Sequence, residues 1–90
     1  MMTVHLPPDL AEEFGAPLTV RIPTENLATL VSALNRQYPG MAGWLAEADG
    51  RFREHLSIFV DGRRIKPGED PLTLLSPSSE VWILRAISGG

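Results

Sequence analysis

Four short segments of the chain are rich in apolar residues and have the length of β-strands. They cover residues 2–6, 18–22, 56–60 and 81 to 86 or 87. Successive side chains of a strand point to opposite faces of a sheet, so each segment can bury one face and expose the other. Asp61-Gly62 follows the third segment and is a strong signal for a tight hairpin turn. We therefore predict a short further strand over residues 63–66.

An apolar stripe with helical spacing lies between the second and third predicted strands. Its members fall at i, i+3, i+4, i+7 and i+11: Leu27, Leu30, Val31, Leu34 and Tyr38. This spacing predicts one main helix that buries a single face. We expect Thr24 to be its N-cap, Glu25 to lie in its first turn, and Pro39-Gly40 to end it.

Two smaller elements complete the predicted framework. Met41, Trp44 and Leu45 indicate a short second helix, and residues 9–15 form either one helical turn or a loop closed by Gly15. Residues 67–79 are rich in turn-forming residues, and three leucines among them are expected to plug the core: Leu72, Leu74 and Leu75.

The order of these elements predicts an α+β domain. The order is ββαββ with a minor inserted helix, in a mixed sheet of four to five strands crossed by one main helix. The last strand is the most apolar, which suits a central position, and the helix allows a right-handed crossover that places it parallel to the first. This is the arrangement of the ubiquitin-like β-grasp fold. We assign residues 1–87 to one such domain and residues 88–90 to a flexible tail.

Composition excludes several classes of function. The 90 residues are 43% apolar, as in an ordinary globular domain. The net charge of -3 comes from interspersed signs, without the basic stripe that a nucleic-acid partner requires. No apolar stretch approaches the roughly 18 residues of a membrane span. The chain has no cysteine, which excludes disulfides, thiolate metal sites and cysteine nucleophiles and fits a cytoplasmic protein.

The titratable residues do not form a recognisable enzyme site. The two histidines, His5 and His55, have no partners at metal-ligand spacing, so we predict no metal site. The acidic pairs at positions 12–13 and at 47 and 49 lie on helix and turn segments and are expected to be solvated. The basic cluster at 63, 64 and 66 fits a charged sheet edge, which discourages aggregation between strands. We therefore predict that the chain is not an enzyme by itself.

The sequence finishes with Ser88-Gly89-Gly90 directly after the last apolar segment. Glycine lacks Cβ, so a Gly-Gly terminus can pass through a narrow channel in conformations closed to other residues. An enzyme could then bring the Gly90 carboxylate to a nucleotide phosphate and activate it.

Four segments together resemble the ubiquitin-like sulfur-carrier family, which includes the small subunit of molybdopterin synthase and the carriers of thiamine and cysteine biosynthesis. They are residues 10–15, the helix end at 38–40, the strand and turn at 58–62, and residues 81–90. The resemblance covers essentially the whole chain, and the Gly-Gly tail is its most specific part. The inserted second helix is more similar to the longer members than to the compact thiamine type.

The resemblance implies a mechanism centred on Gly89 and Gly90. A ubiquitin-activating-type enzyme would use ATP to adenylate the Gly90 carboxylate, and a persulfide protein would supply sulfur to form a thiocarboxylate. An acceptor synthase would then receive the sulfur. The chain itself would bind no cofactor, and it has no phosphate-binding glycine motif.

Strand alternation predicts where such a partner docks. If Val81, Ile83 and the stem of Arg85 face the helix, alternate residues of that strand face away from it. On the third strand, Leu56, Ile58 and Val60 would then point inward and Phe59 outward, although a register slip of one residue would exchange the faces. We predict that Phe59, Trp82 and Leu84 form an apolar patch on the open face, together with His5. Three residues near the tail are also predicted to bind the partner: Arg85, Ala86 and Ser88.

Two other functions use the same features. A ubiquitin-like modifier would join its activated terminus to a lysine, and a non-catalytic interaction subunit would only insert its tail into a partner. Among sulfur carriers, the fold does not distinguish molybdopterin, thiamine, cysteine or related pathways, because the partner determines the pathway.

Overall fold

The computed structural model describes residues 2–24, 26–48, 52–65 and 79–85. Several predictions therefore fall outside the described residues. They are the first-turn residue Glu25, Asp49, Lys66, the core leucines Leu72, Leu74 and Leu75, the strand end at 86–87, and the tail residues Ser88, Gly89 and Gly90.

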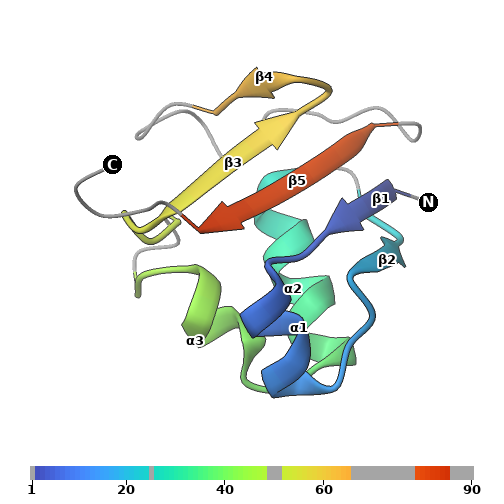
Figure 1. Cartoon of the computed structure of the whole chain (residues 1–90), viewed down its shortest axis with the longest axis vertical. Helices are drawn as coiled ribbons and strands as arrows, with labels where there is room; N and C mark the ends of the chain where they lie inside the picture. The colour runs from blue at the N-terminus through green and yellow to red at the C-terminus, as the bar shows by residue number, and fades with distance from the viewer. Residues whose placement is uncertain (1, 25, 49–51, 66–78, 86–90) are drawn as a thin grey trace.

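Five strands form one mixed sheet in the order β2-β1-β5-β3-β4. Their bounds are β1 Met2–His5, β2 Thr19–Ile22, β3 Leu56–Val60, β4 Arg63–Arg64 and β5 Glu80–Arg85. The last strand is central and runs parallel to β1, whereas the pairs β1–β2, β3–β5 and β3–β4 are antiparallel (Figure 1). The predicted α+β architecture and central last strand are confirmed.

The helices in the described part of the chain lie along one side of this sheet (Figure 1). They are α1 Pro8–Phe14, α2 Leu27–Gln37 and α3 Met41–Leu45. The segment predicted as one turn or a loop is the seven-residue helix α1. Pro8 at its first position suits a helix start, because the missing N–H would have no partner there. Gly15 ends α1 in the left-handed region at φ 63°, which glycine adopts without strain.

The predicted N-cap of the main helix is wrong by two residues. Asn26, not Thr24, caps α2: its Oδ1 accepts a hydrogen bond from the Thr29 backbone N–H at 2.9 Å. The Asn26 backbone N–H donates in return to the Thr29 hydroxyl at 3.3 Å, which completes a capping box. Thr24 instead supports this cap, with its hydroxyl 2.6 Å from that of Thr29.

The core lies between the sheet and the helices, and the predicted strand faces are confirmed. Val81 and Ile83 of β5 are fully buried, and Leu56 and Ile58 of β3 are nearly so. Val60 is partly buried against the same cluster. The buried positions of the three helices join them: Leu10, Ala11, Leu27, Leu30, Leu34, Met41 and Leu45. The opposite sheet face therefore remains available for another role.

The turn between β3 and β4 also anchors the start of β5. Asp61 and Gly62 have φ of 50° and 87°, as the predicted tight hairpin requires. The Asp61 backbone N–H donates to the Glu80 carbonyl at 2.9 Å, and the Glu80 backbone N–H donates to Asp61 Oδ1 at 2.8 Å. These two bonds fix the turn to the neighbouring strand.

Candidate docking surface on the open sheet face

A row of side chains crosses the open face from one sheet edge to the other. The strand register places five residues side by side across β2, β1, β5, β3 and β4: Thr19, His5, Trp82, Phe59 and Arg64. Glu80 and Leu84 flank Trp82 along β5, because residues two apart on a strand share a face. The predicted partner residues Phe59, Trp82 and Leu84 are therefore brought together.

Trp82 is the largest exposed group of this face. It is 41% exposed, and Leu84 beside it is 42% exposed. The His5 imidazole stacks on the indole with a centroid separation of 3.8 Å and an interplanar angle of 17°. The indole N–H donates to Glu80 Oε1 at 2.8 Å. The ring is thus held in one orientation while much of its surface faces solvent.

His5 links the edge of the sheet to this group. Its Nδ1 lies 3.1 Å from the Thr19 hydroxyl, and its Nε2 lies 3.4 Å from Glu80 Oε1. The side chain is only 18% exposed, so His5 supports Trp82 more than it forms the surface itself. In the part of the chain that the structure describes, no cluster of metal-ligating side chains includes His5 or His55.

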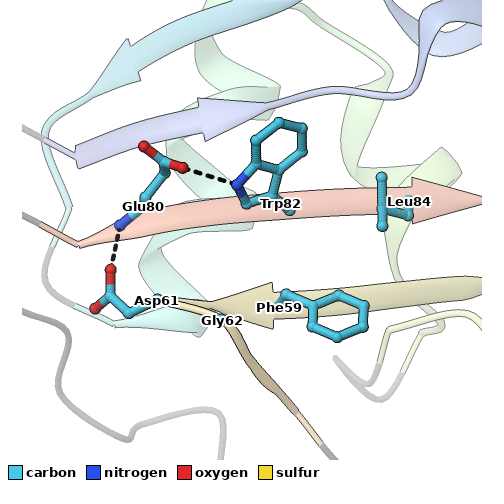
Figure 2. A pocket seen from close by; sticks show the side chains of 6 residues that line it. All are labelled: Phe59, Asp61, Gly62, Glu80, Trp82 and Leu84. Carbon is cyan, nitrogen blue, oxygen red and sulfur yellow. Dashed lines mark hydrogen bonds between the residues drawn. The ribbon is translucent and has the colours of Figure 1, made fainter.

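An open depression lies beside Trp82 on this face. Figure 2 shows its lining, which comes from β3, the turn after it and β5: Phe59, Asp61, Gly62, Glu80, Trp82 and Leu84. Phe59, Trp82 and Leu84 make its surface apolar, and Asp61 and Glu80 place two carboxylates at one end. A hydrophobic floor with a charged rim is the usual composition of a protein-binding patch.

Arg85, predicted to contact a partner, lies on the other side of the sheet. It forms an ion pair with Asp9 of α1, and its guanidinium carbon lies 5.8 Å from the centre of the Trp44 ring of α3. The Trp44 indole N–H in turn donates to Glu13 at 3.2 Å. Arg85 therefore connects the end of β5 to the helices, and its predicted contact with a partner remains a prediction. Ala86 and Ser88 lie outside the described residues.

The sequence interpretation missed the two carboxylates of the depression. Glu80 lies two residues before Trp82, so strand alternation would have placed it on the open face. Asp61 was assigned only to the turn, because its hydrogen bond to Glu80 joins residues 19 positions apart. That contact has no local signal in the sequence.

No helix among the described residues has the length and hydropathy needed to span a bilayer. No family model matches the chain, and no curated protein matches its sequence.

Solved structures do match the fold over nearly the full chain. CysO in the complex of BexX and CysO from Amycolatopsis orientalis is 16% identical, with a TM-score of 0.86 and complete coverage of both chains. Mycobacterium tuberculosis CysO is 22% identical with a TM-score of 0.85, covering 97% of this chain and 100% of that one. SAMP1 from Haloferax volcanii, a small archaeal modifier protein, is 25% identical with a TM-score of 0.75, covering 99% and 98%.

The chain has the ubiquitin-like β-grasp fold of CysO and SAMP1, and these neighbours match the sulfur-carrier family that its sequence resembles.

Proposed function

We propose that the chain is a sulfur carrier whose C-terminal Gly90 carboxylate is converted to a thiocarboxylate by partner enzymes. The observation that carries this proposal is the full-length likeness to CysO and SAMP1 in a chain whose sequence reads Gly89-Gly90, with three residues between β5 and Gly89. The proposal requires Gly90 to be the C-terminal residue of the protein in the cell.

The chemistry begins with adenylation of the Gly90 carboxylate. A carboxylate oxygen attacks the α-phosphate of ATP and pyrophosphate leaves, which makes the acyl carbon electrophilic. The terminal sulfur of a persulfide protein attacks that carbon and AMP leaves, giving an acyl disulfide. A second thiol then attacks the disulfide and releases the thiocarboxylate. Because this chain has no cysteine, both thiols belong to partner proteins.

The carrier contributes a docking surface and an unhindered terminus, and the adenylating enzyme contributes the nucleotide site. The open sheet face supports the docking step, because an oriented aromatic ring beside other apolar side chains is the usual anchor of a protein interface. The thiocarboxylate would finally give its sulfur to an acceptor held on a synthase of a biosynthetic pathway such as that of molybdopterin, thiamine or cysteine.

A second candidate is protein modification, favoured by the likeness to two structures of small archaeal modifier proteins. In that case a lysine amine attacks the adenylated or thioester-linked terminus and forms an isopeptide bond. The two functions share the activation step and differ only in the nucleophile.

The shared activation step is tested by ATP–pyrophosphate exchange with the adenylating enzyme of the same genome. We expect exchange that depends on the chain and is lost when Gly89 and Gly90 are deleted. The deletion variant keeps every residue of the described core, so its thermal unfolding should match that of the full chain. Equal exchange with and without the two glycines would contradict the proposal. No exchange with any adenylating enzyme of the genome would favour a non-catalytic interaction subunit.

A further inference from the structure

The depression beside Trp82 has a fixed acidic end. Asp61 Oδ1 accepts the Glu80 backbone N–H at 2.8 Å, and Glu80 Oε1 accepts the Trp82 indole N–H at 2.8 Å (Figure 2). The Glu80 side chain is nevertheless 52% exposed, and Asp61 is exposed too. Both carboxylates are therefore held in place and still reachable from solvent, which lowers the entropy that a ligand's binding would otherwise cost.

The basic side chain in contact with this acidic end is His5, whose Nε2 lies 3.4 Å from Glu80 Oε1. Two arginines among the described residues share the open face with it, Arg21 on β2 and Arg64 on β4. Arg21 lies opposite Thr3, which lies opposite Glu80, so two strand spacings of about 5 Å each separate Arg21 from Glu80. Arg64 lies opposite Phe59 rather than Asp61. The described arginines of this face thus lie on the two edge strands, whereas Glu80 lies on the central strand beside the His5 imidazole.

The combination fits an arginine side chain better than a purely apolar one. A planar guanidinium can pair with a carboxylate through two N–H groups while its plane stacks on an aromatic ring, whereas an ammonium group has no plane to stack. Glu80 and Trp82 present such a carboxylate and ring in contact with each other. Phe59 and Leu84 supply apolar surface further along the depression for a neighbouring residue.

We propose that the depression lined by Phe59, Asp61, Glu80, Trp82 and Leu84 docks an arginine of the adenylating partner, with an apolar residue beside it. The arginine pairs with the two carboxylates and its plane covers the indole. This inference rests on the proposed function, because it specifies the chemistry that the partner must present. It predicts that association is steered by charge and weakens with salt.

Replacing each carboxylate by its isosteric amide removes the negative charge and keeps the hydrogen bonds that the side chain accepts. In Glu80→Gln the side-chain oxygen can still accept the indole N–H, and in Asp61→Asn it can still accept the Glu80 backbone N–H. Asparagine also tolerates the positive φ of position 61. The matched control is Glu12→Gln with Glu54→Gln, which removes the same two charges from exposed residues outside the depression.

The first measurement is the KM for the chain in ATP–pyrophosphate exchange at low and high salt. We expect the Asp61→Asn, Glu80→Gln variant to raise KM about tenfold at low salt with kcat unchanged, and to lose most of the salt dependence. The control variant should behave as the wild type does. A KM for the double variant equal to that of the control would overturn the proposal while leaving the sulfur-carrier function intact.

A second measurement does not depend on the activating reaction, so it separates failure of this inference from failure of the proposed function. The peptides N-acetyl-Leu-Arg-Leu-amide and its citrulline counterpart are titrated into the ¹⁵N-labelled chain. We expect the arginine peptide to shift the Trp82 indole and Glu80 amide signals more than the uncharged citrulline peptide does. The double amide variant should lose that difference. Equal shifts from both peptides, or none from either, would overturn the proposal.

A second copy of the chain is the other occupant that the measurements must exclude. Light scattering of the wild-type chain over a range of concentrations reports it. A dimer that the double amide variant abolishes would assign the depression to self-association and overturn the docking of a partner's arginine. A monomer at all concentrations agrees with the proposal.

Discussion

Replacing Trp82 by alanine tests the two faces of β5 against each other. Ile83, the next residue, is fully buried under the helices, whereas Trp82 is 41% exposed on the open face. The pair Trp82→Ala and Ile83→Ala therefore removes neighbouring side chains from opposite sides of one strand. If the open face is a docking surface, both changes should reduce stability, but only the first should weaken binding of a partner by the folded chain.

The magnitudes follow from exposure. A tryptophan has about 250 Å² of surface to bury, so its exposed fraction leaves roughly 100 Å² for a partner to cover. At about 25 cal/mol per Å², covering that area contributes up to about 2.5 kcal/mol, or roughly 70-fold in Kd. The remaining surface, roughly 150 Å², is already covered in the folded chain, in part by the stack on His5, so by the same coefficient we expect Trp82→Ala to lower the free energy of unfolding by about 2–4 kcal/mol. Ile83→Ala should cost about 3–4 kcal/mol, because it leaves a cavity in the core.

The assays are urea unfolding followed by far-UV circular dichroism and calorimetric titration of each variant with the adenylating enzyme. Circular dichroism is preferred to tryptophan fluorescence because Trp82→Ala removes one of the two tryptophans of the chain. We expect Trp82→Ala to remain folded and to bind at least tenfold more weakly than the wild type. Unchanged affinity of Trp82→Ala would refute the reasoning, and so would an equal loss of affinity in a folded Ile83→Ala variant.

Three further predictions concern the framework around this surface. Gly40→Ala should lower the free energy of unfolding by about 1–2 kcal/mol, because Gly40 has φ 101°, a conformation that residues with a Cβ rarely adopt, although the added Cβ itself would only be in ordinary contact with the Phe14 ring. Gly43→Ala is its control, helical with open space around it, and should leave stability unchanged or higher in the same urea titration. Asn26→Ala should cost about 1 kcal/mol by removing the cap of α2, while Asn26→Asp retains most of that stability; equal losses would contradict the cap. Asp9→Asn should change stability by less than about 1 kcal/mol at low salt and not at all in 1 M NaCl, because its ion pair with Arg85 is exposed; a loss that persists in salt would contradict this.

The sheet could be predicted from the sequence because its pattern is local. Met2 and Val4 alternate with Thr3 and His5, and this regular pattern identifies the buried face of β1 without knowledge of its neighbours. The β5 sequence is less decisive, because the exposed Trp82 and Leu84 are about as apolar as the buried Val81 and Ile83. Both faces of β5 are apolar in sequence, so the prediction that Trp82 and Leu84 form the docking surface depends on assigning them to the open face.

The errors arose where two local signals compete or where contacts are long-range. Thr24 and Asn26 are both good N-caps two residues apart, and only the geometry shows that Asn26 is the cap while Thr24 supports it. Prolines 7 and 8 can end a strand as well as begin a helix, so the sequence predicts only one turn or a loop over residues 9–15 where the structure has helix α1. The pairing of Arg85 with Asp9 joins residues 76 positions apart, which no local pattern indicates.

The intact mass of the chain most directly tests the central claim that its terminus carries sulfur. The protein is purified from its own cell and from a reaction with ATP, a persulfide donor and the adenylating enzyme. The mass of the starting protein first establishes whether the chain finishes at Gly90. We then predict a gain of about 16 Da, from replacement of one oxygen by sulfur, that is located at Gly90 by fragmentation and is absent from Gly90→Ala. An unchanged mass with an active adenylating enzyme and a competent sulfur donor would contradict the sulfur-carrier function, and covalent adducts with other proteins in its place would assign the chain to protein modification.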